Sequence, residues 1–205
     1  MRTGQIINRL RDEYLTLMSA VGTEASRILS EKTFIAGGAI ASLVLDEEPK
    51  DFDVWFHDIE AWNAVITAMP MAPDRTSKYS FTYTVNGRVF QLVRSRLGSP
   101  EKVTKTFDFR HTQAYFDPLG LRLVVDEEFI KAKQLVFVRG NLCHPVNTVQ
   151  RVLKFARRGY SINNQTIADL MNEVGEIYQM RREDSGEEAD VFHPGWGGGG
   201  EEDSR

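Results

Sequence analysis

Apolar and polar residues alternate along the chain in a pattern that predicts helices interleaved with short strands. Residues 5–30 repeat apolar side chains at helical spacing and predict an amphipathic helix. Its apolar arc holds Ile6, Ile7, Leu10, Tyr14, Leu17, Met18 and Val21. Short apolar runs predict a strand at residues 32–36 and a helix at residues 38–45. Pro49 should end that helix before a strand at residues 51–56.

The clearest local signal is a β-hairpin. Strands at residues 79–85 and 88–93 flank Asn86-Gly87, a pair typical of two-residue turns because both central positions need a positive φ. Before the hairpin, Asp58 precedes a helix that runs through Trp62 and Val65, and its carboxylate can cap the first turn of that helix.

The second half of the chain begins with short strands and ends in helices. Three strands are expected, at residues 106–109, 113–116 and 121–125. Asp126 begins a helix that runs towards Phe137, and its first acidic residues suit the helix dipole. Helical character returns from residue 147 to about residue 182. Gly159 should end the first helix there, and residues 161–164 supply a cap for the last one.

These elements predict an α/β fold, with a small, mixed and strongly twisted sheet that carries helices largely on one face. Four segments follow from the pattern: a packing helix at residues 1–31, a core at 32–140, a helical cap at 141–183 and a tail at 184–205. The tail is rich in glycine and acidic residues, so it is expected to be flexible. Phe192 and Trp196 within it are candidates for docking on a protein partner.

Composition narrows the classes of function. The 205 residues carry a formal net charge of -4, so overall charge does not indicate a nucleic-acid-binding protein. Cys143 is the single cysteine, which excludes a disulfide framework. Apolar runs fall short of the roughly 18 residues that cross a bilayer, and the N-terminus shows no targeting segment. We therefore expect no membrane partner and a cytoplasmic protein, in the host cytoplasm if the chain is viral.

The candidate chemistry lies between residues 37 and 53. Gly37-Gly38 ends an apolar run, and Asp51 and Asp53 follow on the second strand, where alternation points both carboxylates to one face. Two like charges on one face repel each other unless a cation lies between them, and hard divalent cations prefer carboxylate oxygens and phosphate. Glycines let the backbone approach an anion closely. The combination predicts nucleotide chemistry assisted by Mg²⁺ or Mn²⁺.

This order of residues resembles the DNA polymerase β-like nucleotidyltransferase superfamily. The shared signature is Gly37-Gly38, a spacer of twelve residues, and then Asp51-Phe52-Asp53-Val54. The pattern is closest to phage-encoded nucleotidyltransferase-like proteins. The resemblance implies an enzyme that transfers a nucleoside monophosphate from an NTP to a hydroxyl, on RNA, protein or a small molecule. It also implies two metal ions held by three carboxylates, of which Asp51 and Asp53 match two.

The third carboxylate is harder to place. The family position best matches Phe90 or Gln91, and neither is an acid. Asp108 is the nearest candidate as a catalytic, metal-binding residue, because its aromatic neighbours would pack inwards and leave the acid on the opposite face. Asp117 is the second choice, although an acid before Pro118 is first of all a turn residue.

Nucleotide contacts are expected from several residues. Gly37 and Gly38 would lie against the phosphates, and Ser42 could donate its hydroxyl to them. A cationic side of the helix at residues 147–160 would hold the triphosphate or a polynucleotide backbone, or would simply be solvated. Its residues are Arg151, Lys154 and Arg158.

A second class of function stays open: a nucleotidyltransferase-like fold without catalysis, acting as a binding or structural module in a virus particle or a toxin–antitoxin pair. Gln91 in place of an acid favours this alternative. So does Ala41, which stands where the tRNA-end-adding branch has an arginine, and this difference also makes that branch's activity doubtful. His57 and His111 are expected at the surface, with the rim of the cleft as the alternative position.

Overall fold

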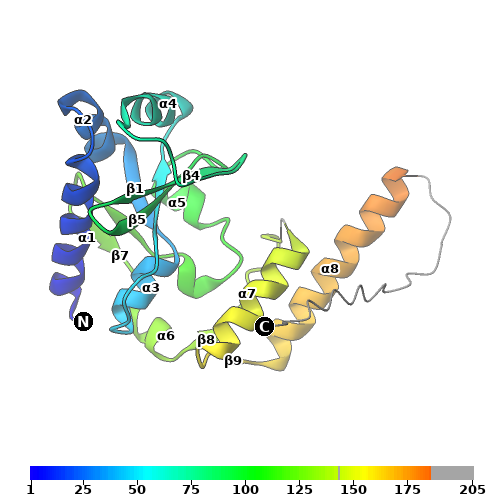
Figure 1. The fold of residues 1–205 in the computed structure, drawn as a ribbon. Helices are drawn as coiled ribbons and strands as arrows, with labels where there is room; N and C mark the ends of the chain where they lie inside the picture. The colour runs from blue at the N-terminus through cyan, green and yellow to red at the C-terminus, as the bar shows by residue number, and fades with distance from the viewer. Residues whose placement is uncertain (143, 186–205) are drawn as a thin grey trace, which may run out of the picture.

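The structure, a computed structural model, describes residues 1–142 and 144–185 (Figure 1). Cys143, Phe192 and Trp196 lie outside the described residues. The helices are α1 (Thr3–Met18), α2 (Thr23–Lys32), α3 (Gly38–Val44), α4 (Ile59–Ala68), α5 (Pro100–Thr104), η1 (Arg110–Thr112, a 3-10 helix), α6 (Glu127–Lys131), α7 (Pro145–Arg157) and α8 (Asn164–Ser185). The strands are β1 (Thr33–Ala36), β2 (Phe52–Phe56), β3 (Arg75–Thr76), β4 (Ser80–Val85), β5 (Arg88–Val93), β6 (Tyr115–Asp117), β7 (Arg122–Val124), β8 (Gln134–Leu135) and β9 (Ser161–Ile162).

The main sheet has seven strands in the order β3-β4-β5-β2-β1-β6-β7. Strands β2 and β5 are parallel, and the other neighbouring pairs are antiparallel. The sheet is therefore mixed, and the expected α/β fold class is confirmed. A separate parallel pair, β8 with β9, lies next to the C-terminal helices (Figure 1).

One face of the sheet forms the main apolar core. Phe52, Val54 and Phe56 of β2 point into it together with Phe90 and Leu92 of β5. Helices α1, α2, α3 and α4 contribute their apolar faces to the same cluster. Because the side chains of a strand alternate, Asp53 and Gln91 must point to the other face. The helices that cover the core thus leave the carboxylates on the side away from α1 and α2.

Several predicted elements are confirmed. The hairpin is present, and both turn residues adopt a positive φ, 49° at Asn86 and 76° at Gly87. The Asp58 side chain accepts a hydrogen bond from the amide of Ala61 at the start of α4. Asn163 caps α8 in the same way, accepting from the amide of Thr166 at 2.7 Å.

Other predictions were wrong. The single helix expected at residues 5–30 is two helices, because the chain turns after Met18 and Gly22 becomes the N-cap of α2. No strand forms at residues 106–109, where the amides of Thr106 and Phe107 bond back to carbonyls of α5. The helix expected to run to Phe137 ends at Lys131, and Lys133 then takes a left-handed φ of 49°.

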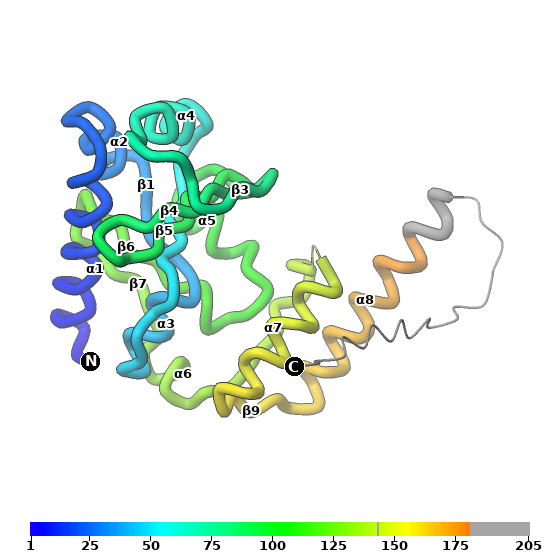
Figure 2. The backbone as a smooth tube through the Cα atoms, in the orientation of Figure 1, coloured from blue at the N-terminus to red at the C-terminus, as the bar shows by residue number. Residues whose placement is uncertain are grey.

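Helices α7 and α8 form an arm beside the sheet, on the side away from α1 and α2 (Figures 1 and 2). A second apolar cluster joins the arm to the loop after α5, with Phe109, Phe155 and Leu170 among its members. Glu173 of α8 is buried and accepts hydrogen bonds from the amides of Gly140 and Leu142. Within the described residues, no helix is both long and apolar enough to cross a membrane.

The turn between β1 and α3 gives a first prediction. Gly37 has φ 99° and ψ -143°, a conformation close to one that only glycine adopts readily, and strain of this kind costs about 1–3 kcal/mol. Gly38 has no atom within 4 Å of an added Cβ. We therefore expect Gly37→Ala to lower the free energy of unfolding by about 1–3 kcal/mol, and Gly38→Ala to leave it unchanged or slightly raised. Urea denaturation measures both variants, and equal effects would contradict the assignment.

Candidate functional site

The site is built around the turn that follows β1. The amide of Gly37 donates to the carbonyl of Ala114 at 3.1 Å, which fixes the turn against the segment before β6. A Cβ added to Gly37 would lie 3.7 Å from Oδ2 of Asp53. The turn and the carboxylate of β2 are therefore neighbours, as the spacing in the sequence predicts.

Asp51 and Asp53 face the same cavity. Asp51 is exposed just before β2, whereas Oδ1 of Asp53 is buried and has no hydrogen-bond partner among the described residues. The pKa of Asp53 is raised to about 7, chiefly because burial penalises the charged form and also because Asp51 repels it. Lys154 and Arg151 act in the opposite direction. Within the described residues, the half-buried carboxylate of Asp53 therefore has a free oxygen and no positively charged group bonded to it.

The cavity, which we call the carboxylate cavity, has a volume of about 680 Å³. It lies between the sheet and α7. It brings together most of the residues singled out in the sequence: Gly37, Gly38, Asp51, Asp53, Asp108, Arg151 and Lys154. Tyr79, Gln91 and Arg96 also line it. Asp51 and Asp53 thus lie at and just before β2, and Arg151 and Lys154 face them from α7.

Asp108 lines this cavity but has other partners. Its side chain is only 5% exposed, and its Oδ2 accepts from the hydroxyl of Thr148 at 2.8 Å and from the guanidinium of Arg151. Both partners belong to α7, so Asp108 anchors the arm to the core. Among the residues that the structure describes, no three His, Cys, Asp or Glu side chains are grouped closely enough to hold a metal ion.

Ser42 and Arg158 do not line the cavity. The guanidinium of Arg158 donates to Oγ of Ser42 at 3.0 Å and pairs with the carboxylate of Glu47. Hydrogen bonding to Arg158 lowers the pKa of Glu47, and Lys133 Nζ lies 3.3 Å from the same carboxylate. These contacts tie the end of α7 to α3, so in this conformation both residues serve the packing of the arm.

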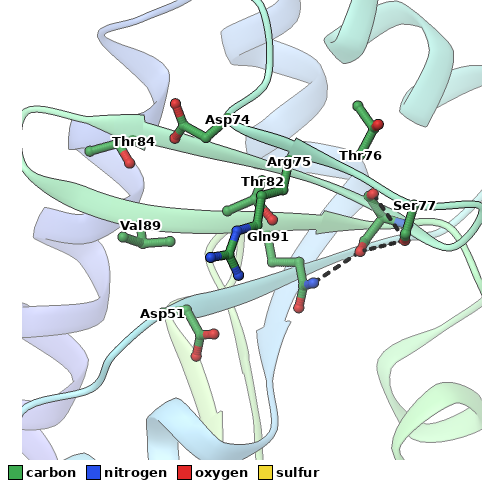
Figure 3. Close-up of a pocket in the computed structure, with 10 residues that line it drawn as sticks. Asp51, Asp74, Arg75, Thr76, Ser77, Thr82, Thr84, Val89 and Gln91 are labelled. Carbon is green, nitrogen blue, oxygen red and sulfur yellow. Dashed lines mark hydrogen bonds between the residues drawn. The ribbon is translucent and has the colours of Figure 1, made fainter. Parts of the chain in front are cut away.

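Gln91 occupies the strand position beside Asp53, because the two residues are directly paired between β5 and β2. Its Nε2 donates to Oγ of Ser80 at 2.9 Å (Figure 3). An amide therefore stands where the resemblance places a third carboxylate.

The sequence analysis did not identify Thr148 as a residue of the site. Its spacing of three residues from Arg151 on one helix was the available signal.

The expected surface position of His111 was wrong. The ring is 1% exposed and packs between Phe155, at 4.3 Å between ring centroids, and Tyr160, at 4.7 Å. Burial lowers the pKa of His111 to about 3, so the ring is neutral at physiological pH. The histidine is part of the aromatic contact between core and arm.

Comparison with known proteins identifies the family. The model of the Gabija anti-defense 2 family matches residues 6–134, which is more than half of the chain. The chain belongs to the Gabija anti-defense 2 family. No curated protein matches it.

Solved structures similar to this Gabija anti-defense 2 family protein include CCA-adding enzymes. The enzyme of Bacillus stearothermophilus in complex with CTP is 16% identical, with a TM-score of 0.57 over 75% of this chain and 41% of its own. A CCA-adding enzyme in complex with ATP is 18% identical, with a TM-score of 0.54 over 88% and 45%. The Thermotoga maritima enzyme complexed with tRNA is 18% identical, with a TM-score of 0.50 over 82% and 46%.

These likenesses confirm that the family member has the nucleotidyltransferase fold. The chain spans less than half the length of those three enzymes. At such low identity the likeness shows the fold alone, and the activity has to be argued from the site.

The raised pKa of Asp53 predicts a pH-dependent effect on stability. In the absence of metal, the folded protein holds this proton up to about pH 7, whereas the ordinary pKa is 3.8. Its contribution to stability is therefore complete below about pH 4 and is lost as the pH rises through 7. The amide of Asp53→Asn stays uncharged at every pH, so this variant cannot lose that contribution. We expect the variant to gain on the order of 2 kcal/mol over the wild type at pH 8, and less at pH 5.

Urea denaturation with a chelator at both pH values measures this difference. Asp12→Asn is the matched control, because Asp12 is an exposed acid on α1. A pH-independent effect of Asp53→Asn, equal to that of the control, would show that the Asp53 carboxylate is not destabilised by burial.

The Asp108 contacts give a prediction about the arm. Asp108→Asn should cost about 1.5–3 kcal/mol locally, because it removes the charge from a buried hydrogen bond to Arg151. Amide hydrogen exchange should become faster in α7 and stay unchanged in α1. Glu24→Gln breaks the exposed pair with Arg27 and serves as control, because solvent screens that pair and its loss should leave both stability and exchange nearly unchanged. Unchanged exchange in α7 would mean that Asp108 does not anchor the arm.

Proposed function

We propose that this protein is a nucleotidyltransferase that depends on a divalent cation and moves a nucleoside monophosphate from an NTP to a hydroxyl acceptor. The observation that carries the proposal is the free, buried Oδ1 of Asp53 beside Asp51, in a cavity that Arg151 and Lys154 face from α7. The side chains supply what a metal–triphosphate complex needs: two carboxylates for the cation and two cations for the phosphates.

The residues fit Mg²⁺ or Mn²⁺. Mg²⁺ commonly takes one or two carboxylates and completes its shell with water and substrate phosphate, so Asp51 and Asp53 would suffice to hold one ion. When bound, the cation supplies charge stabilisation at the phosphoryl oxygens and orients the attacking hydroxyl. A second ion held by three carboxylates would require Asp108 to release Arg151 and Thr148.

The nucleotide would lie between the Gly37-Gly38 turn and α7. Gly38 leaves open space for a phosphate, since nothing lies within 4 Å of its Cβ position. Arg151 and Lys154 would neutralise the triphosphate, while Ser42 and Arg158 would reach it only if Arg158 left Glu47. The likeness to CCA-adding enzymes solved with CTP and with ATP supports an NTP as the donor. The acceptor hydroxyl would attack the α-phosphorus, and pyrophosphate would leave.

The family description adds a biological setting. A protein of the Gabija anti-defense 2 family is expected to act against a Gabija defence, and we propose that it does so in the cytoplasm of the host. A nucleotidyltransferase would act against the defence most directly by modifying one of its components.

A second candidate function is binding without catalysis. Two observations favour it: Asp108 is engaged by Arg151 and Thr148, and Gln91 stands beside Asp53 where a third carboxylate is expected. In that case the cavity would hold a partner or a nucleotide and leave it unchanged. Release of pyrophosphate from bound NTP separates the two functions.

The metal site gives a direct test. The double variant Asp51→Asn, Asp53→Asn should lower the affinity for fluorescent NTP in Mg²⁺ to the level that the wild type shows with a chelator. The reason is that amides do not replace charged ligands for a hard cation. Isothermal titration with Mn²⁺ alone should show the same loss.

Gln91→Glu tests the same site in the opposite direction. It places a carboxylate at the position paired with Asp53, so Mn²⁺ affinity should rise several-fold. Asp12→Asn is the control for both measurements. Unchanged metal and NTP affinity in the double variant would rule out the proposed function.

A further inference from the structure

A second cavity lies beside the first, on the open face of β3, β4 and β5 (Figure 3). We call it the sheet-face cavity; its volume is about 550 Å³. Asp51 and Gln91 line both cavities, so the two adjoin at these residues. Hydroxyl side chains make up much of the wall, namely those of Thr76, Ser77, Ser80, Thr82 and Thr84.

Strand pairing connects this cavity to the carboxylates in a straight row. Asp53 of β2 pairs with Gln91 of β5, Gln91 pairs with Thr82 of β4, and Thr82 pairs with Arg75 of β3. Residues paired in this way point to the same face of a sheet. Neighbouring strands are about 4.8 Å apart, so the backbone of Arg75 lies roughly 14 Å from that of Asp53.

The wall offers free hydrogen-bonding groups. Within the described part of the chain, the side chains of Arg75, Thr82 and Thr84 bond to no other protein group. Ser80 and Ser77 are used within the wall, since Ser80 bonds to Gln91 and Ser77 accepts from two amides. The unpartnered groups of the wall thus include the hydroxyls of Thr82 and Thr84 and the guanidinium of Arg75.

The distribution of charge argues against a polynucleotide here. A nucleic-acid strand binds through several Lys and Arg residues, each neutralising a phosphate. The sheet-face cavity has one cation, Arg75, and Asp74 beside it offsets the charge. The other cations, Arg96, Arg151 and Lys154, line the carboxylate cavity, where the triphosphate is proposed to bind. Neutral amides and carbonyls match this wall better than phosphates do.

The row from Asp53 to Arg75 runs across the strands, so a segment that follows it crosses the face of the sheet at right angles to β3. An extended polypeptide in that position carries its backbone amides and carbonyls past the free hydroxyl of Thr82 and the guanidinium of Arg75.

We propose that the sheet-face cavity binds the acceptor and that the acceptor is a Ser, Thr or Tyr hydroxyl on an extended polypeptide. The inference rests on the proposed nucleotidyltransferase function. The acceptor oxygen bonds to the α-phosphorus, the bond from that phosphorus to the β-phosphate oxygen breaks, pyrophosphate leaves with its electron pair, and the hydroxyl proton passes to solvent. An extended chain rises about 3.4 Å per residue, so Arg75 meets a group roughly four residues from the modified hydroxyl.

The test uses the full chain with Mg²⁺ and NTP labelled at the α-phosphate. The acceptors are total bacterial protein, total bacterial RNA, and synthetic peptides with one Ser, Thr or Tyr and a Glu placed two to six residues away. Label should enter material that protease destroys and ribonuclease does not. Peptides with Glu about four residues from the hydroxyl should be labelled best, because the carboxylate can pair with Arg75.

Two variants tie the labelling to the cavity. Arg75→Ala should reduce peptide labelling about tenfold, as expected for a lost charged hydrogen bond, with the affinity for fluorescent NTP unchanged. Thr82→Val should reduce it less, again without an effect on NTP affinity. Arg122→Ala is the matched control, since Arg122 is exposed on β7 at the opposite edge of the sheet and should have no effect.

Each of the remaining outcomes would overturn a different part of the proposal. Label in RNA alone would mean a polynucleotide acceptor. Peptide labelling that is insensitive to Arg75→Ala and Thr82→Val would place the acceptor elsewhere. Binding of NTP in Mg²⁺ without any labelled polypeptide would overturn the acceptor class while leaving nucleotide binding intact. Absence of Mg²⁺-dependent NTP binding would end the proposed function first, and the acceptor site with it.

Discussion

Strand β2 lies in the middle of the sheet, and the alternation of its side chains determines where the rest of the molecule must lie. Phe52, Val54 and Phe56 enter the main core, so Asp51 and Asp53 are directed to the other face. A shift of pairing by one residue would bury both carboxylates among aliphatic side chains. Residues paired directly between neighbouring strands point to the same face of the sheet. The polar face of β2 therefore continues across β5, β4 and β3.

The arm is held over these carboxylates by polar contacts at both ends of α7. Thr148 and Arg151 bond to Asp108 near its start, and Arg158 bonds to Ser42 and Glu47 just after its end. Between these contacts Lys154 faces the carboxylate cavity. The attraction between β2 and α7 is only partial, because Asp53 keeps an unpartnered oxygen and a raised pKa. Among the described residues, the carboxylate of Asp53 and the cations of α7 thus lie near each other without forming an ion pair.

Local chemistry was predictable from the sequence, whereas partnerships over long separations were not. The glycine turn, the hairpin and the caps at Asp58 and Asn163 depend on a few adjacent residues, and all were confirmed. Asp108 lies in a loop where a strand was expected, because the amides of Thr106 and Phe107 bond back to α5. Its carboxylate is bonded by residues 40 and 43 positions away, which the local sequence does not reveal. His111 was expected at the surface because nothing local shows the aromatic rings of the arm that enclose it.

The order of strands also limits how the chain can fold. Strand β1 has two neighbours, β2 close by in sequence and β6 far from it, with Ile35 paired to Phe116. The edge of β1 that β6 covers therefore stays open until the chain beyond residue 115 is available. Long-range pairing of this kind is slow, since the loop must be closed before the contact forms. During synthesis, β1, which leads into the Gly37 turn, therefore gains its second partner later than β2 does, because both partners of β2 end before residue 94.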